Sequence, residues 1–272
     1  MKLHGFADYL ATAFLVLSLF CVTSTTILAQ QASSPAPQRN REAITLANKA
    51  ISAMGGLSDA QIQDTLTEAS ITWPQNPAAP ATTTAIKTKG PDRVRIDNQS
   101  GGAALSVIHS QGRGMRSAGN GWKQAPSANS MHKRPEHLPA VLLAYELARP
   151  DLSADYIGLE TLGDMTAHHI RLARVSTMGN DLDAQMTKNS QLDVLIDPQS
   201  FLVLKISYLH FSEIDWRVGW PMEIYYSDYR TVAGMLIPFN QRTVFNGKPH
   251  LILNLTRVAL NQGQPDSDFE GR

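Results

Sequence analysis

The chain contains almost no cysteine. Its 272 residues include one, Cys21, which lies in an apolar segment near the N-terminus. Lipid attachment at this cysteine would require small residues just before it, but Leu19 and Phe20 occupy those positions. If the segment is removed on export, the mature chain has no cysteine, and this excludes disulfides and thiol chemistry even in a compartment that permits them.

An excess of charge of one sign is also lacking. Lys and Arg together number 24, Asp and Glu together number 24, and the formal net charge is +0. The basic residues are scattered along the chain, whereas a surface that binds nucleic acid needs a basic stripe. The composition therefore excludes nucleic acid as a partner.

Familiar catalytic motifs are missing as well. The sequence contains no G-x-S-x-G, H-E-x-x-H or C-x-x-C, and neither of the Gly-rich phosphate-binding patterns G-x-G-x-x-G and G-x-x-x-x-G-K-[ST]. We therefore predict no catalytic residue, no metal, no cofactor and no enzymatic activity.

Two histidine groups are nevertheless candidates for a metal site. His168 and His169 are adjacent, but neighbours on a strand point to opposite faces of the sheet, so one ion cannot easily bind both. His132 and His137 form a second group with Glu136, where the chain enters an apolar helix. Packing and surface roles explain both groups more simply than a metal.

Pairs of carboxylates and a run of aromatic residues offer further candidates. Asp193 with Asp197, or Glu213 with Asp215, could perform acid and base catalysis of the glycosidase kind. The aromatic residues of segment 216–229 could form a binding lip or a membrane-contact edge. Turn and strand roles for the carboxylates, and packing of the aromatic rings between strands, remain the simpler alternatives.

The N-terminus has the pattern of a secretory signal peptide. Lys2 and His4 precede the apolar run Leu10–Phe20, and a small residue, Ala29, offers a cleavage point. The alternative is a membrane anchor, but a spanning helix needs about 20 consecutive apolar residues, and threonine and serine interrupt this run. We expect a signal peptide over residues 1–29, cleavage near Ala29 and a periplasmic protein.

The remainder is predicted to be one domain. Residues 30–41 are polar and proline-containing and predict a disordered spacer. Residues 42–272 then form a single, mostly β domain, since all-β domains of 200 to 250 residues are common. Its opening segment, 44–54, carries apolar residues at helical spacing and ends at a pair of glycines, as a capped amphipathic helix does.

Strand and turn patterns dominate the rest of this domain. Alternating apolar residues recur along it, and Asp197-Pro198-Gln199-Ser200 is typical of a type I turn between two strands. Asn246-Gly247 is the strongest hairpin pattern in the chain. Segment 136–148 differs because apolar residues cover much of its helical circumference, which predicts a buried helix on the concave face of the sheet or in its mouth.

Several of these features together resemble the LolA/LolB-like family of outer-membrane lipoprotein-sorting carriers. They follow one another in the same order over most of the mature chain: Met54-Gly55-Gly56, Pro91-Asp92-Arg93-Val94-Arg95, Val194-Leu195-Ile196-Asp197-Pro198, Leu204-Lys205-Ile206, the segment Tyr226 to Gly234, Ile237-Pro238, Asn246-Gly247 and Val258-Ala259-Leu260-Asn261. The chain is longer than the shorter members of this family, with extra residues at 119–135 and 176–190.

The resemblance implies a fold and a function. The fold would be a curved antiparallel incomplete β-barrel with helices packed on its concave face. The function would be a periplasmic carrier that holds a lipid or lipoprotein acyl chain in an apolar cavity and meets envelope membrane proteins. The cavity residues that it suggests, four on the helical lid and five on strands, are Leu138, Val141, Leu142, Tyr145, Ile170, Leu172, Leu204, Ile206 and Ile224.

Two other functions stay open at this point. The same fold with a filled core would make a non-catalytic structural or interaction module of the envelope, contacting its partner through segment 216–229. An enzyme that uses an unrecognised carboxylate pair is the third possibility. The volume between the helix at 136–148 and the sheet distinguishes these functions.

Overall fold

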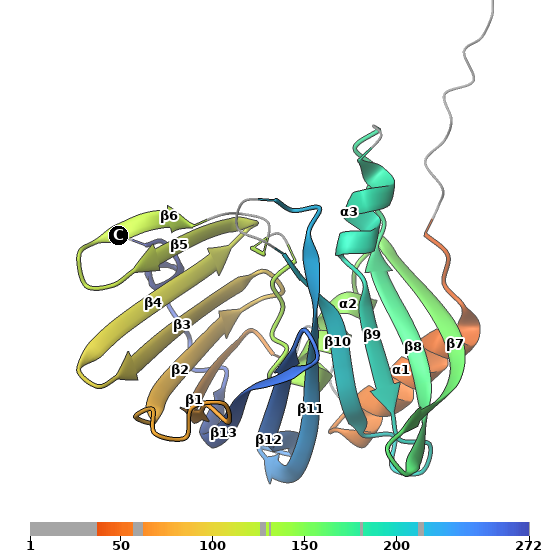
Figure 1. Ribbon diagram of the computed structural model, residues 1–272. Coiled ribbons are helices and arrows are strands. Elements are labelled where there is room, and N and C mark those ends of the chain that lie inside the picture. The colour runs from red at the N-terminus through yellow and green to blue at the C-terminus, as the bar shows by residue number, and fades with distance from the viewer. Residues whose placement is uncertain are drawn as a thin grey trace, which may run out of the picture. The chain divides into compact units, whose positions relative to one another are not determined.

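The computed structural model describes residues 37–56, 62–125, 129–130, 132–179, 182–211 and 215–271. The predicted signal peptide and most of the predicted spacer lie outside the described residues. Within the described residues, thirteen strands form one antiparallel sheet, which is curved and does not close (Figure 1). The strands are β1 (Asp64–Thr72), β2 (Thr82–Lys89), β3 (Arg93–Ser100), β4 (Ala103–Ser110), β5 (Arg113–Ser117), β6 (Trp122–Ala125), β7 (Leu152–Leu162), β8 (Met165–Arg174), β9 (Leu192–Ile196), β10 (Val203–Phe211), β11 (Gly219–Val232), β12 (Met235–Phe245) and β13 (Lys248–Leu260).

The sheet consists of two meanders joined at their first and last strands. Strands β1 to β6 follow one another toward one edge, and β7 to β13 follow one another from the opposite edge back to β1. The junction is the antiparallel pair β1–β13, in which Leu66 lies opposite Ala259. The two edge strands, β6 and β7, are consecutive in the chain, so the segment between them has to cross from one edge of the sheet to the other.

The turn patterns of the sequence are confirmed. Asn246 and Gly247 both have positive φ, +48° and +74°, as a two-residue hairpin turn of type I′ requires, and they join β12 to β13. Asp197 ends β9, and its carboxylate accepts a hydrogen bond from the Ser200 backbone nitrogen at 3.1 Å. β9 and β10 then pair as the predicted hairpin.

Helix α1 (Arg41–Ala53) confirms the predicted opening helix. The Asn40 side chain caps its first turn by accepting from the backbone nitrogens of Glu42 and Ala43 at 2.9 and 3.1 Å. Arg39 already forms a parallel bridge to Ala154 of β7. Arg39 and Asn40, which the sequence analysis assigned to the spacer, are thus hydrogen bonded or bridged to α1 and β7.

The glycine pair after α1 also has a packing role. Gly55 has a φ of +123°, and a Cβ at this position would lie 2.8 Å from the Gly234 carbonyl oxygen. The Met54 carbonyl next to it accepts from the Leu236 backbone nitrogen at 3.0 Å. A glycine therefore lets the end of the helix approach the turn before β12 closely enough to bond with it.

Helix α2 (Pro139–Leu147) is shorter than predicted. It begins three residues after Glu136 because proline suits the first helical position, where its missing N–H would have no helical partner. Eight of its nine residues are buried, as the apolar circumference predicts. A third helix, α3 (Asp183–Asn189), and the 3-10 turn η2 (Asp266–Phe269) have no counterpart among the sequence expectations.

Both longer helices pack on the concave face of the sheet. α1 contacts β7, β8 and α2 and crosses these strands in Figure 1. The buried side chains of α1, α2 and the concave faces of β7 to β10 form one hydrophobic core, which includes Leu46, Leu142, Leu172, Val194 and Ile206. The helices thus fill the concave side over the β7–β10 meander.

Candidate functional site

Two adjoining cavities lie where the concave face continues beyond the helices. The first has a volume of about 330 Å³ and lies against β3 to β5 and β10; the second has about 260 Å³ and lies against β1 to β3 and β11 to β13. Both are lined by Ile96, Lys133, Arg134, Glu136 and Tyr208, and together we call them the hollow. Its size falls in the range of small-molecule sites, about 300–1,000 Å³.

The hollow is lined mainly by apolar side chains from alternate strand positions. In the second cavity the apolar residues are Ile71, Trp73, Ile86, Val94, Ile96, Tyr208, Ile224, Leu251 and Leu253. Alternate residues of a strand share a face, and the strand register places Ile71 opposite Leu253 and Ile86 opposite Ile96. The β1–β4 meander and the C-terminal strands therefore supply one continuous apolar wall.

The wall of the hollow that lies opposite the sheet is formed by the segment of chain that connects the two edges of the sheet. Residues 132–138, here called the crossing segment, lead from β6 toward α2 and contribute Lys133, Arg134, Glu136 and His137 to the lining of the hollow. The segment is bonded to the sheet at two carbonyls. The Tyr226 hydroxyl donates to the Glu136 carbonyl oxygen at 2.6 Å, and the Gln241 side-chain amide donates to the His137 carbonyl oxygen at 2.8 Å.

A buried ion-pair network fixes the other side of the crossing segment. Arg134 Nε lies 2.8 Å from Glu146 Oε1, and both side chains are at most 3% exposed. Arg174 of β8 donates to the same carboxylate. Burial alone would raise the pKa of Glu146, but the two guanidiniums hold it at about 2. Glu146 is therefore ionised, and it joins the crossing segment, α2 and β8.

Three histidines around the hollow, His109, His132 and His137, are neutral at neutral pH. Burial, together with the charge of Lys133, lowers the pKa of His109 to about 4 and that of His137 to about 3. Burial, together with the charge of Arg134, lowers the pKa of His132 to about 3. At neutral pH these rings therefore contribute hydrogen-bonding atoms and no charge.

Three buried polar atoms of residues that line the second cavity lack a hydrogen-bond partner within the part of the chain that the structure describes. They are Thr84 Oγ1, Asn98 Oδ1 and His137 Nε2. Buried polar atoms in native proteins are nearly always bonded, so each is a point at which a bound molecule could be held.

Eight of the nine residues that the resemblance suggested for the cavity belong to the buried hydrophobic core, which also includes Ile71, Ile86, Val94 and Leu253 of the hollow. The eight are Leu138, Val141, Leu142, Tyr145, Ile170, Leu172, Ile206 and Ile224. Ile224 also lines the hollow. Leu204 lies at a bulge, where the pairing with β9 shifts between Val203 and Lys205, so Val203 takes the buried position and Leu204 is half-buried.

The sequence analysis did not propose most of the residues that line the hollow. Threonines at positions 82, 84 and 88 alternate along β2 and are buried, although threonine alternation is also typical of an exposed strand face. For the crossing segment the sequence contained a partial indication, because His132, Glu136 and His137 were considered together as a candidate metal site. The structure brings these three residues to the hollow but does not bring their side chains onto one point.

The other candidates of the sequence have structural partners. His168 bonds the Tyr156 hydroxyl at 3.1 Å, and His169 bonds Asp193 at 2.9 Å; these partners lie on opposite faces of the sheet, as predicted. Asp197 belongs to its turn. Glu213 lies outside the described residues.

The aromatic segment 216–229 does not form one exposed lip. The Tyr226 hydroxyl is bonded to the crossing segment, and the Tyr229 hydroxyl donates to the Val203 carbonyl oxygen at 2.6 Å. The Trp220 ring lies 6.1 Å from that of Phe245, measured between centroids. These contacts favour packing over partner binding for this segment.

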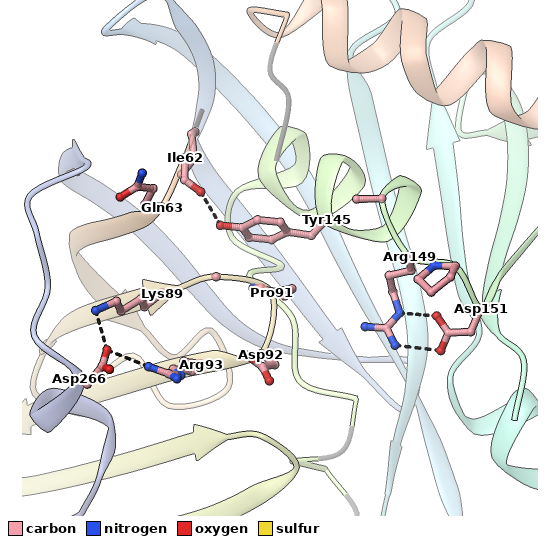
Figure 2. A pocket seen from close by; sticks show the side chains of 13 residues that line it. Ile62, Gln63, Lys89, Pro91, Asp92, Arg93, Tyr145, Arg149, Asp151 and Asp266 are labelled. Atoms are coloured by element: carbon pink, nitrogen blue, oxygen red, sulfur yellow. Dashed lines mark hydrogen bonds and ion pairs between the residues drawn. The ribbon is translucent and has the colours of Figure 1, made fainter. Parts of the chain in front are cut away.

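A separate open groove of about 950 Å³ lies near the end of α2 (Figure 2). Five of its charged side chains are paired with one another: Asp266 with Lys89 and Arg93 at 2.6 and 2.8 Å, and Arg149 with Asp151 at 2.8 Å. Tyr145 projects into it and donates to the Ile62 carbonyl oxygen at 2.7 Å. Ion pairs thus engage several of the charged side chains of this open groove, whose remaining lining includes apolar residues such as Ile62, Pro91 and Ala148.

The arrangement of sheet and helices is similar to that of several solved structures. A domain from Vibrio parahaemolyticus named for outer membrane lipoprotein sorting aligns with a TM-score of 0.54 at 10% identity, over 84% of this chain and 96% of that one. A LolA superfamily protein from Nitrosomonas europaea aligns with the same score and coverage at 11% identity. The chain has a LolA-like fold. No protein-family model and no curated protein matches its sequence.

A third solved structure extends this comparison. A DUF1329 family protein from Desulfovibrio piger aligns with a TM-score of 0.50 at 14% identity, over 84% of this chain and 97% of that one. Nearly the whole length of each of these proteins is therefore matched by the LolA-like sheet and helices. Within the described residues, no helix is long and apolar enough to cross a membrane.

Proposed function

We propose that this protein binds a lipid or a lipoprotein acyl chain in the hollow and carries it through the periplasm without covalent chemistry. The observation that supports the proposal is the hollow itself, which is mainly apolar and is bounded by the crossing segment in a LolA-like fold. Burial of hydrocarbon there stabilises the complex by about 0.8 kcal/mol per CH₂ group.

Export belongs to this proposal. The signal peptide expected over residues 1–29 would deliver the chain to the periplasm, where an acyl chain in transit must be kept from water. N-terminal sequencing of protein recovered from the envelope should give a start near Gln30 without an attached lipid. A start at Met1, or a lipid on Cys21, would contradict this part of the proposal.

The experiment that tests binding is a titration with a fluorescent fatty-acyl probe whose emission rises in apolar surroundings. The substitution Ile96→Trp adds volume at a residue that lines both cavities, so we expect it to lower the affinity at least roughly ten-fold, the loss of about 1.4 kcal/mol. Gln99→Trp on the same strand is exposed and serves as the control.

The outcomes are distinct. Saturable binding by the wild type and by the Gln99→Trp control, with loss in Ile96→Trp, supports the proposal. No binding by the folded wild type, or equal binding by all three proteins, would contradict it. The filled-core interaction module would then be the better account, because the helices already form a solid core over β7 to β10.

A further inference from the structure

Among the described residues, four buried polar atoms without a hydrogen-bond partner belong to residues that line the hollow: Thr84 Oγ1, Asn98 Oδ1 and His137 Nε2 in the second cavity and His132 Nδ1 in the first. Thr84 of β2 and Asn98 of β3 are opposite each other in the strand register, so their side chains are neighbours on the concave face. His137 belongs to the crossing segment on the other side of the same cavity. Thr84 is 4% exposed and His137 is 6% exposed, so bulk water does not reach either residue freely.

This group is surrounded by hydrocarbon. Ile86 lies on β2 beyond Thr84, Ile96 lies on β3 beyond Asn98, and Leu251 and Leu253 complete the wall. Leaving a buried donor or acceptor unbonded is unfavourable, and here three such atoms belong to residues that line one cavity. A purely hydrocarbon ligand cannot form hydrogen bonds, so these atoms would remain unbonded in the complex.

The capacity of the three atoms to donate or accept hydrogen bonds limits which chemical group of a ligand could bond to them. Asn98 Oδ1 only accepts hydrogen bonds, whereas the Thr84 hydroxyl both donates and accepts. Burial and the charge of Lys133 lower the pKa of His137 to about 3, so its ring is neutral. A partner for all of them must donate a proton to the Asn98 oxygen and be able to accept one from Thr84.

A carboxylate does not satisfy these requirements. It has no proton to donate to Asn98, and a buried anion needs a cation beside it. The nearest cations already have carboxylate partners, since Lys133 Nζ lies 2.7 Å from Glu136 Oε2 and Arg134 is paired with Glu146. An uncharged hydroxyl meets both requirements because it is donor and acceptor at once.

We infer that the hollow takes an amphiphile that carries an uncharged hydroxyl group, buried against Thr84, Asn98 and His137, with its hydrocarbon along the apolar wall of β1 to β3 and β13. Long-chain alcohols and hydroxylated acyl chains are ligands of this class. The inference rests on the proposed function, because it names the ligand chemistry of the same hollow.

The test compares three ligands of one saturated chain length by competition with the fluorescent acyl probe at neutral pH: the primary alcohol, its methyl ether and the fatty acid. The ether keeps the oxygen but cannot donate. We expect the alcohol to bind roughly ten-fold more tightly than the ether, as one well-formed buried hydrogen bond allows, and more tightly than the acid.

Substitutions then test whether the preference for the alcohol over the ether arises at Thr84 and Asn98. Thr84→Val keeps the shape of the side chain and removes its hydroxyl, and Asn98→Leu removes the acceptor. In each variant the preference for the alcohol over the ether should fall to about two-fold or less, while the affinity for the ether is kept. Thr83→Val is the matched control on the exposed face of the same strand and should leave the preference unchanged.

The results separate this inference from the function on which it rests. If the wild type binds the probe but prefers the acid, or does not distinguish alcohol from ether, the inference is overturned and lipid binding stands. If both variants keep the preference of the wild type, the hydroxyl does not bind at this group and the inference is also overturned. If the wild type does not bind the probe, the proposed function fails and the inference fails with it.

Discussion

At the scale of single residues, two buried threonines of one strand differ in their hydrogen bonding. Thr65 and Thr67 of β1 are both fully buried on the concave side. The Thr65 hydroxyl lies 2.7 Å from that of Thr88 on β2, whereas Thr67 Oγ1 has no partner in the described part of the chain. The hydroxyl of Thr65 therefore stabilises the fold, whereas the unbonded hydroxyl of Thr67, two positions away, lowers its stability.

This difference predicts opposite effects of one substitution. Thr67→Val removes an unbonded hydroxyl and keeps the shape, so it should leave the free energy of unfolding unchanged or raise it by about 1 kcal/mol. Thr65→Val breaks a bond and leaves the Thr88 hydroxyl alone, so it should lower that free energy by about 1–3 kcal/mol. Urea unfolding of both variants measures the two effects. Equal losses in both would contradict this account of the strand.

At the scale of elements, the crossing segment owes its position to the Arg134–Glu146–Arg174 network. Glu146→Gln would leave two buried guanidiniums without their counter-charge, and we expect a loss of about 3–5 kcal/mol in the free energy of unfolding. Asp151→Asn is the control, because the Arg149–Asp151 pair is about a third exposed and should contribute less than about 1 kcal/mol. Denaturant unfolding measures the free energy of unfolding of both variants. Similar small losses in the two would show that the network does not fix the position of the crossing segment.

The histidines at the hollow predict how stability responds to acid. His109, His132 and His137 have folded pKa values of about 4, 3 and 3 and an ordinary value of 6.5. The unfolded chain therefore binds more protons below pH 6.5, and stability is fully present above that pH and falls as the pH is lowered toward 4. Each histidine contributes a slope of up to about 1.4 kcal/mol per pH unit.

Urea midpoints measured across this range test the slope. Glu146 contributes only below its ordinary pKa of 4.5, so the interval from pH 6.5 to 4.5 isolates the histidines. His137→Phe removes one of these histidines, so it should reduce the dependence of the unfolding free energy on pH in this interval by the contribution of a single histidine. A wild-type stability that is flat over this interval would mean that the rings are not held neutral.

The sequence predicted the elements of this protein better than it predicted the site. Alternation along strands, the Asp197 and Asn246-Gly247 turns and the all-round apolar helix gave the sheet, its hairpins and the burial of α2. The bulge at Leu204 could not be predicted, because it depends on the pairing of β10 with β9 and leaves the alternation of apolar residues almost intact. The start of α2 was placed too early because the apolar pattern continues through Leu138 into the segment before it.

The hollow was beyond prediction for a different reason. Its walls come from two meanders and from the crossing segment, and only the β1–β13 pairing brings Ile71 opposite Leu253. Its polar members, Thr84 and Asn98, stand at positions that an alternating pattern assigns equally well to the solvent face. Sequence reasoning therefore placed the ligand beneath α2, and of the nine residues that it suggested only Ile224 also lines the hollow.

At the scale of the whole molecule, the strand order explains why a filled region and a hollow coexist on one concave face. The chain completes β1 to β6, crosses the concave side and returns through β7 to β13, so α1 and α2 pack over β7 to β10 while the earlier strands face the crossing segment. In this LolA-like fold, the β7–β10 core gives rigid support, and the hollow is the surface that we propose binds the ligand.

The central claim, that an acyl chain occupies the hollow, is tested most directly by photo-crosslinking with a diazirine-bearing fatty-acyl chain, followed by peptide mass spectrometry. We expect adducts on the peptides that contain Ile71, Val94, Ile96, Leu251 and Leu253, with competition by unlabelled lipid and loss of labelling in Ile96→Trp. Adducts confined to α2 and β8, or to the outer surface of the sheet, or labelling that unlabelled lipid does not reduce, would contradict it.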